Sequence, residues 1–229
     1  MEILLYIAFF IFGTVIGSFL NVLIYRLPRG KSPLKPVFSF CPECGTNIKW
    51  YDNIPVVSYI LLKGRCRNCG HRISIRYLIV EIITGVASVL SYLKWGLSID
   101  YLFIFIFLCV IIAITFIDID FKIIPDELNL SGFLTGIVYT FFRGDFTVLD
   151  GFSGAVVGAG FLWAVAYLYM KFRGIEGLGM GDVKMMAFVG MYAGWFGALF
   201  TIFVGSFLGA LIGGLSAYLL KALKTKWEI

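Results

Sequence analysis

The stretch of sequence that decides the fold is MMAFVGMYAGWFGALFTIFVGSFLGALIGGLSAYLL, residues 185–220, where 36 consecutive residues carry no charge. About 20 apolar residues cross a bilayer as a helix, so this run is long enough to cross it twice. We expect the chain to reverse near Gly194, Trp195, Phe196 and Gly197, because glycines interrupt the apolar pattern there. The segment therefore predicts two membrane helices.

Comparable runs occur along the rest of the chain. Residues 3–25, 101–117, 128–142 and 151–170 are uncharged, and 77–93 is interrupted only by Glu81. The 229 residues are 60% hydrophobic and 14% charged, and their mean hydropathy of +0.92 lies outside the range of soluble domains. A removable signal peptide cannot account for runs that recur along the whole chain. We predict an all-α polytopic integral membrane protein with about seven transmembrane helices.

The positive charges indicate its topology. If the loop after the first helix is cytoplasmic, that side holds 17 of the 19 Lys and Arg residues, ten of them in 26–76, and the opposite side holds only Lys94 and Arg143. This asymmetry follows the positive-inside rule. Topology and anionic membrane lipids therefore account for the net charge of +5, and we expect no nucleic-acid partner.

Four of the five cysteines form two pairs after the first apolar run. Cys41 and Cys44 lie in CPECG, and Cys66 and Cys69 lie in CRNCG. Two C-x2-C pairs separated by 21 residues are typical of tetrahedral zinc sites. Disulfides are the competing interpretation, which a reducing cytosol disfavours. We predict a structural zinc ion in a small cytoplasmic loop domain between helices 1 and 2, because this loop is too short for a sizeable core.

Two other residues bear on the zinc prediction. His71, the single histidine, is an alternative ligand, although a surface position is the plainer expectation. Cys109 lies inside an apolar run and is expected to be a small buried hydrophobic residue.

Two aspartates lie where predicted membrane helices meet the cytoplasmic side. Asp118 follows 17 uncharged residues, which span roughly 26 Å of helix, just short of the ~30 Å hydrocarbon core. Asp182 opens the sixth predicted helix from the same side. Two carboxylates that share a proton can hydrolyse a peptide bond, because one acts as acid while the other activates water. We expect Asp182 to face Asp118 as a catalytic pair that needs no metal.

The residues around this pair allow for other roles. Gly179 and Gly181 precede Asp182, where glycine lets a substrate backbone approach closely. Asp120 cannot pair with Asp118 on a regular helix, because residues two apart point away from each other. Asp182 also suits a helix N-cap, so a purely structural role stays open.

Further acidic residues have ordinary explanations as well. Asp126 follows Pro125 and suits a cap or turn, while Glu81 is expected to pair with a nearby arginine such as Arg76 or to reach the interface. Asp120 and Glu176 suit solvated positions at the membrane rim, where they can also attract a basic substrate segment.

Five segments in order resemble the bacterial type IV prepilin peptidases, which are membrane aspartic proteases of the Gly-x-Gly-Asp class. The segments are GSFLNVLIYRLPRG (17–30), CPECGTNIKWYDNIPVVSYILLKGRCRNCG (41–70), ISIRYLIVE (73–81), IDIDFKIIPDELNL (117–130) and EGLGMGDVKMMAFVG (176–190). The resemblance assigns catalysis to Asp118 and Asp182 and leaves Asp120 in support. Family members commonly continue into a further C-terminal helix opened by Phe-Gly-Pro, whereas this sequence ends at KALKTKWEI.

The resemblance also implies a substrate and a second activity. The implied substrates are prepilins and the related pseudopilins of type II secretion or DNA-uptake machinery, cut after a glycine that ends a short basic leader at the cytoplasmic face of the bacterial inner membrane. Many relatives then N-methylate the new N-terminal residue with S-adenosylmethionine. The candidate leader-binding residues are acidic and lie on the cytoplasmic rim: Asp120, Asp126, Glu127 and Glu176.

The expected organisation has three parts. Residues 1–25 form transmembrane helix 1, 26–76 form the zinc-binding loop domain, and 77–229 form the transmembrane peptidase core with helices 2–7. A cation transporter and a zinc-loop membrane scaffold are the alternatives, since rim aspartates can also bind cations. No convincing internal repeat supports the transporter.

Overall fold

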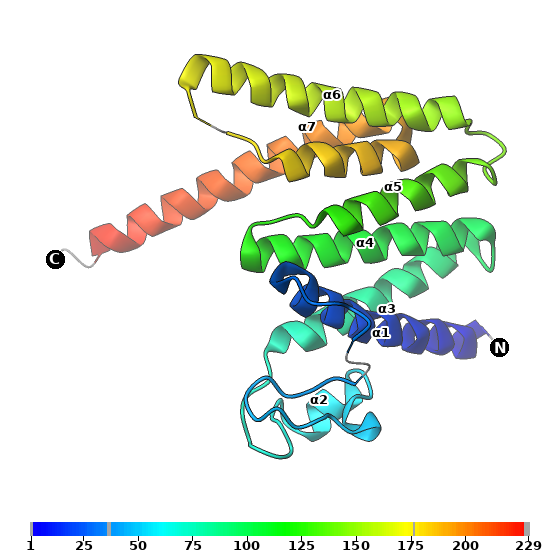
Figure 1. The fold of residues 1–229 in the computed structure, drawn as a ribbon, viewed down its shortest axis with the longest axis vertical. Helices are drawn as coiled ribbons and strands as arrows, with labels where there is room; N and C mark the ends of the chain where they lie inside the picture. Colours follow the sequence, from blue (N-terminus) through cyan, green and yellow to red (C-terminus); the bar gives the residue numbers. More distant parts are fainter. Residues whose placement is uncertain (1, 36–37, 176, 227–229) are drawn as a thin grey trace. The chain divides into compact units, whose positions relative to one another are not determined.

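A computed structural model describes residues 2–35, 38–175 and 177–226, with side chains as far as residue 215. Regular structure in these residues is helical, and β-structure is limited to the isolated bridges Phe40–Asn47 and Arg65–Arg72. The chain forms two compact units, Met1–Thr135 and Gly136–Ile229. Figure 1 shows the helices of both units.

The first unit contains three long helices and the beginning of a fourth. These are α1 (Glu2–Arg26), α3 (Ile75–Trp95), α4 (Ile99–Phe121) and the first turns of α5 (Asp126–Thr140). The segment between α1 and α3 holds only the short elements η1 (Leu27–Arg29), η2 (Trp50–Asp52) and α2 (Val57–Leu61). Ser74 and Ser98 cap α3 and α4, because each side chain accepts a hydrogen bond from a backbone N–H in the first helical turn.

Glycines bring α1 and α3 into close contact. A Cβ at Gly17 would lie 2.8 Å from the Cα of Glu81, and one at Gly13 would lie 2.7 Å from the Cβ of Ser88. Gly85 on α3 is equally close to the Phe10 ring on α1. Small residues at such spacing let two membrane helices approach at backbone distance. Because the two backbones are so close, polar residues near the end of α1 lie beside those near the start of α3.

The second unit consists of the last turn of α5, then α6 (Val148–Arg173) and α7 (Met180–Lys226). The helix α6 begins with a capping box, in which Thr147 and Asp150 satisfy each other's backbone N–H groups. Gly151, Gly154 and Gly158 face α7 directly, and a Cβ at Gly154 would lie 2.7 Å from the Cα of Gly194.

The long helix α7 is broken at Gly194, whose φ of 70° and ψ of 178° are not helical. Positive φ is the conformation that glycine adopts at little cost. Arg143 donates a hydrogen bond of 2.9 Å to the carbonyl of Tyr192, two residues before the break. Figure 1 shows the part after the break running back along the unit. The reversal expected near Gly194 is therefore confirmed.

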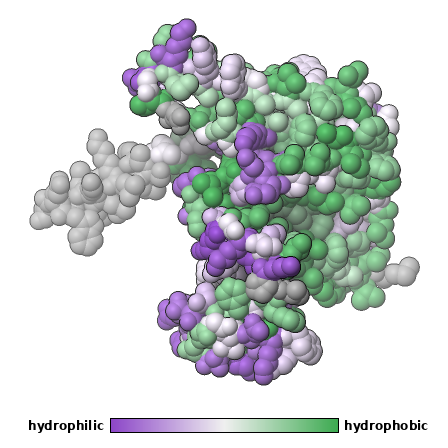
Figure 2. Space-filling model, viewed as in Figure 1, coloured by the Kyte–Doolittle hydropathy of each residue, from purple (hydrophilic) through white to green (hydrophobic). Residues whose placement is uncertain are grey.

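The membrane class expected from the sequence is also confirmed. Among the described residues, α1, α3, α4, α6 and α7 are long and apolar enough to cross a membrane. Their outward side chains are mostly hydrophobic, whereas hydrophilic side chains gather on the segment between α1 and α3 (Figure 2). Because the break divides α7 in two, the described chain has seven helices longer than α2. These are α1, α3, α4, the 15-residue α5, α6 and the two parts of α7.

Two alanine substitutions on α6 test this helix contact. At Gly154 the added Cβ would meet the backbone of Gly190 and Gly194, whereas at Gly160 it would meet nothing within 4 Å. We expect Gly154→Ala to lower the free energy of unfolding by about 1–3 kcal/mol, as overpacking does. Gly160→Ala should leave it unchanged or raise it by up to about 1 kcal/mol through helix propensity.

The measurement is the unfolding midpoint of the purified protein in detergent as SDS increases. Equal midpoints for the two variants would show that Gly154 is not in backbone contact with α7.

Candidate functional site

The two cysteine pairs fold into two matching turns. In the first, the Cys41 N–H donates to the Thr46 carbonyl at 3.0 Å and the Gly45 N–H to the Cys41 carbonyl at 2.9 Å. In the second, Cys66 bonds to the His71 carbonyl and Gly70 to the Cys66 carbonyl, both at 2.9 Å. Gly45 and Gly70 both have positive φ, which closes each turn after its second cysteine. Each C-x2-C-G sequence is therefore a complete local structure.

The turns bring all four thiols together. The sulfurs of Cys41, Cys44, Cys66 and Cys69 lie within 4.8 Å of one another, and those of Cys41 and Cys69 are 3.8 Å apart. A tetrahedral zinc site with Zn–S bonds of about 2.3 Å has S···S edges of roughly 3.8 Å. All five cysteines of the chain are free thiols, so the disulfide interpretation is not supported. The cluster can hold one metal ion.

The thiols differ in acidity. Hydrogen bonds with the side chain and backbone of Thr46, and with Asn68, lower the pKa of Cys44 to about 6. At Cys69 the backbone N–H of His71 favours the thiolate, but burial and the neighbouring thiols outweigh it and raise the pKa to about 12. Four thiolates in so small a volume repel one another, so a cation is needed to ionise them all.

An ion pair ties the second turn to the rest of the loop. The Arg67 guanidinium donates to both carboxylate oxygens of Asp52 at 2.7–3.0 Å. Hydrogen bonding to Arg67 lowers the pKa of Asp52. His71 lies outside the cysteine cluster, and its Nε2 is 3.7 Å from a carboxylate oxygen of Glu43, with both side chains about half exposed.

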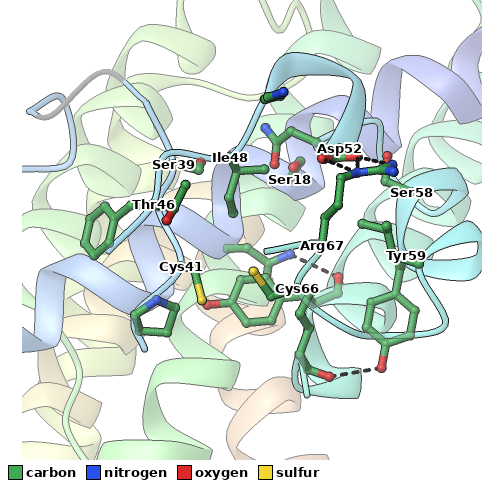
Figure 3. Close-up of a pocket in the computed structure, with 18 of the residues that line it drawn as sticks. Ser18, Ser39, Cys41, Thr46, Ile48, Asp52, Ser58, Tyr59, Cys66 and Arg67 are labelled. Atoms are coloured by element: carbon green, nitrogen blue, oxygen red, sulfur yellow. Dashed lines mark hydrogen bonds and ion pairs between the residues drawn. The ribbon is translucent and has the colours of Figure 1, made fainter. Parts of the chain in front are cut away.

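A cavity of about 320 Å³ adjoins the cluster. Its walls come from the last turns of α1, the first turns of α3 and the loop between them (Figure 3). Glu81 lines it and accepts a hydrogen bond of 2.7 Å from the Val56 N–H. The expected pairing of Glu81 with Arg76 is wrong, because the Arg76 guanidinium forms an ion pair with Asp120 instead.

Asp118 is half-buried in the last turn of α4. The helix ends one turn later at Lys122, whose backbone adopts the left-handed conformation. A carboxylate at this end of a helix meets the negative end of the helix dipole, so Asp118 cannot be explained as a stabilising cap. Asp120, also in the last turn of α4, forms an ion pair with Arg76 at the start of α3. A basic leader at Asp120 would therefore compete with an ion pair inside the protein.

Asp182 lies in the second compact unit, half-buried in the first turn of α7. The helix begins at Met180, so Asp182 is a first-turn residue, and its N–H donates to the Gly179 carbonyl at 3.1 Å. A Cβ at Gly179 would lie 3.2 Å from a carboxylate oxygen of Asp182. Any larger residue at Gly179 would therefore crowd the carboxylate. Gly181 precedes Asp182 within the helix.

The remaining candidate residues are at helix starts or outside the described chain. Asp126 and Glu127 are exposed in the first turn of α5, where carboxylates stabilise the helix dipole. Glu176 lies outside the described residues.

Sequence comparison finds relatives of this chain among known proteins. The sequence profile described as Type IV leader peptidase family matches residues 105–214. A prepilin leader peptidase/N-methyltransferase of Pseudomonas putida is 34% identical over 92% of this chain and 80% of its own length. This chain belongs to the type IV leader peptidase family. The resemblance seen in the sequence is thereby confirmed.

A second profile, Bacterial Peptidase A24 N-terminal domain, matches residues 11–95 of this family member. Proteins with the same name as the Pseudomonas relative occur in two other bacteria. The one from Myxococcus xanthus is 35% identical over 89% of this chain and 61% of its own length. The one from Neisseria gonorrhoeae is 34% identical over 87% of this chain and 78% of its own length. No match was found among solved structures. The four cysteines thus fall in the N-terminal match, and both Asp118 and Asp182 fall in the peptidase match.

Sequence reasoning missed Asn21 and did not expect Glu81 to be buried at a cavity. Asn21 is 2% exposed and Glu81 is 8% exposed. The available signal was an asparagine inside an otherwise apolar helix, because buried polar residues in membrane helices usually serve function or helix association.

Metal content tests the cysteine cluster. We expect about one metal ion per purified chain, and its loss in Cys44→Ser, because structural sites need all of their thiolate ligands. Cys109→Ala is the matched control, since Cys109 is buried in α4 away from the cluster.

The measurement is elemental analysis by plasma mass spectrometry after dialysis. Metal retained by Cys44→Ser, or lost from Cys109→Ala, would contradict the assignment.

Proposed function

We propose that this protein is a membrane aspartic endopeptidase that removes the short basic leader from type IV prepilins and pseudopilins. Cleavage follows a glycine at the cytoplasmic face of the bacterial inner membrane. The observation that carries the proposal is the family match over residues 105–214, a segment that contains both Asp118 and Asp182. The family match does not favour the transporter and scaffold alternatives.

Asp118 and Asp182 form the proposed catalytic pair. One carboxylate is ionised and takes a proton from water, whose oxygen attacks the carbonyl carbon of the leader glycine. The other carboxyl group is protonated and gives its proton to the carbonyl oxygen. The tetrahedral intermediate then collapses, the C–N bond breaks, and the departing nitrogen is protonated to give the new α-amine. Each proton transfer contributes about 10²–10⁴-fold to the rate.

The residues around the pair position the substrate. Gly179 and Gly181 admit its extended backbone beside Asp182, since a side chain at Gly179 would meet the carboxylate. The acidic residues Asp120, Asp126, Glu127 and Glu176 attract the basic leader on the cytoplasmic side. In this assignment, residues 1–25 are a membrane helix, 26–76 a cytoplasmic domain and 77–229 the peptidase core.

The metal is proposed to be zinc with a structural role. The donor set fits it, because four cysteine sulfurs within 4.8 Å match the soft tetrahedral coordination that zinc prefers. A site with four protein ligands has no open position for substrate, so the ion would stabilise the loop and take no part in hydrolysis.

A second activity is proposed from the relatives' names. The Pseudomonas and Myxococcus proteins are named leader peptidase/N-methyltransferases. We propose that this chain also methylates the α-amine released by cleavage, with S-adenosylmethionine as methyl donor. The four-cysteine loop typical of bifunctional members is complete here.

The positive-inside asymmetry supports a cytoplasmic location for the loop and both aspartates. Anionic lipids then contact the basic residues on that face.

Substitution of the aspartates tests the peptidase. We expect Asp118→Asn and Asp182→Asn each to lower the rate of leader removal by at least about 10²-fold, because an amide cannot take part in these proton transfers. Asp145→Asn is the matched control, since Asp145 is an exposed residue between α5 and α6.

The measurement is mass spectrometry of a prepilin incubated with the purified protein in detergent. Normal cleavage by either variant would overturn the proposed pair. Methylation is scored separately, as a gain of one methyl group on the product only when S-adenosylmethionine is added.

A further inference from the structure

Hydrophilic side chains predominate between α1 and α3, and the stretch around α2 departs from this pattern. Four of its apolar side chains are exposed, and together they form the apolar strip: Ile54, Val57, Ile60 and Leu61. The last three are the first, fourth and fifth residues of α2, which lie on one face of a helix. On the other side, Ser58 is only 6% exposed, whereas Leu61 is 75% exposed. A helix with its polar side inward and its apolar side outward is typical of contact with lipid rather than water.

Hydrogen bonds within the loop fix which face of α2 points outward. The Ser58 hydroxyl donates to the Tyr51 carbonyl at 2.8 Å and accepts from the Ile54 N–H at 3.1 Å. The Tyr59 hydroxyl donates to the Ile73 carbonyl at 3.2 Å. These bonds turn the polar side of α2 toward the loop, so the apolar strip is left on the outside.

Contacts with two membrane helices set the depth of α2. The Val56 N–H, immediately before α2, donates to the Glu81 carboxylate at 2.7 Å. Glu81 comes six residues after the start of α3 at Ile75, which is about 9 Å along the helix. Glu81 also bonds to Ser18, eight residues before the end of α1, about 12 Å from that end. The start of α2 therefore lies beside the membrane helices and not beyond their ends (Figure 1).

The length of α3 relates this depth to the bilayer. The helix has 21 residues, so it is about 32 Å long. A hydrocarbon core of ~30 Å takes up nearly all of it, and a point about 9 Å into α3 lies within the leaflet on that side. Exposed apolar residues of α3 face lipid around this level, namely Ile79, Ile82 and Ile83. The apolar strip is therefore a continuation of the lipid-facing surface of the helices.

The residues that flank the apolar strip suit lipid headgroups. Trp50 is 81% exposed in η2, which packs against α2, and tryptophan rings prefer the membrane–water interface. Lys49 precedes η2 and Lys63 follows α2, and both side chains are exposed. Lysine stems can lie along apolar surface while their ammonium groups reach the headgroups, where anionic lipids attract them. The same stretch thus offers an apolar surface for acyl chains and cations for phosphate groups.

We propose that the apolar strip and Trp50 dock the cysteine loop into the lipid leaflet, with acyl chains against the strip and anionic headgroups at Lys49 and Lys63. The lipid contact holds the loop at a third point, besides its covalent connections to α1 and α3. The inference concerns the first unit alone and does not depend on the proposed peptidase activity. The apolar segment of a prepilin is the rival occupant. The depth of α2 favours lipid, because lipid surrounds exposed side chains at this level whether or not a substrate is present.

Photochemical cross-linking to lipid gives the first test. The full chain with Leu61→p-benzoylphenylalanine is reconstituted in vesicles of phosphatidylcholine and phosphatidylglycerol and irradiated. We expect peptides that contain position 61 to carry the mass of a phospholipid, because the photoreactive ring lies among acyl chains. The matched control is Glu43→p-benzoylphenylalanine, at an exposed charged position in the first cysteine turn, which should give few lipid adducts.

Three outcomes of this experiment would overturn the proposal. The first is the absence of lipid adducts at position 61, and the second is an equal yield of lipid adducts at positions 61 and 43. The third arises when a prepilin is added to the vesicles. Lipid adducts at position 61 should persist, and their replacement by prepilin adducts would assign the apolar strip to the substrate instead.

Hydrogen exchange in the same vesicles gives the second test. A double variant with Ile60→Gln and Leu61→Gln removes apolar surface while keeping side-chain size and helix propensity similar. We expect its α2 amides to exchange at least about tenfold faster than those of the wild type, because less apolar burial in lipid holds the helix in place. Leu61→Ile keeps the apolar surface and should exchange as the wild type does. Metal content and the unfolding midpoint report whether each variant is folded, and unchanged exchange in a folded double variant would contradict the docking.

Discussion

The close contact between α1 and α3 is the constraint on which the first unit depends. Gly13, Gly17 and Gly85 remove the side chains that would otherwise separate the two backbones. Helices that approach so closely in lipid gain van der Waals contact and exclude lipid tails. Because the cysteine loop leaves the end of α1 and enters the start of α3, this contact also fixes the span that the loop must bridge. Asn21 and Glu81 face the cavity as a result of the same contact.

Among the described residues between α1 and α3, Cys41 is the only buried hydrophobic side chain, so apolar burial does little to hold the loop in one conformation. Its turns are closed by backbone hydrogen bonds, and its two halves are joined by four thiols and by the Asp52–Arg67 ion pair. An exposed ion pair contributes little to stability, typically up to about 1 kcal/mol. A metal ion held by the four thiols would therefore supply most of the free energy that keeps the halves together. Membrane helices and metal would then be two separate sources of order within one unit.

Much of this organisation could be predicted from the sequence. Uncharged runs located the helices, and the glycines near 194 located the reversal in α7, because both depend on local composition. The C-x2-C spacing identified the metal-binding cluster for the same reason. The partners of Glu81 and Arg76 could not be predicted, since they depend on how α3 packs against α4 and the loop. The cavity was also missed, because its lining comes from three segments that only the fold brings together.

The two cysteine turns have a consequence for how the loop matures. Each is closed by hydrogen bonds between residues no more than five apart in sequence, and the two share the same pattern. Contacts of such short range form early and need no distant partner. As the chain emerges from the ribosome, the first turn can present two sulfurs to a metal ion before the second has been synthesised. Metal capture would then bring the ends of α1 and α3 together, so that the order of synthesis guides helix pairing in the membrane.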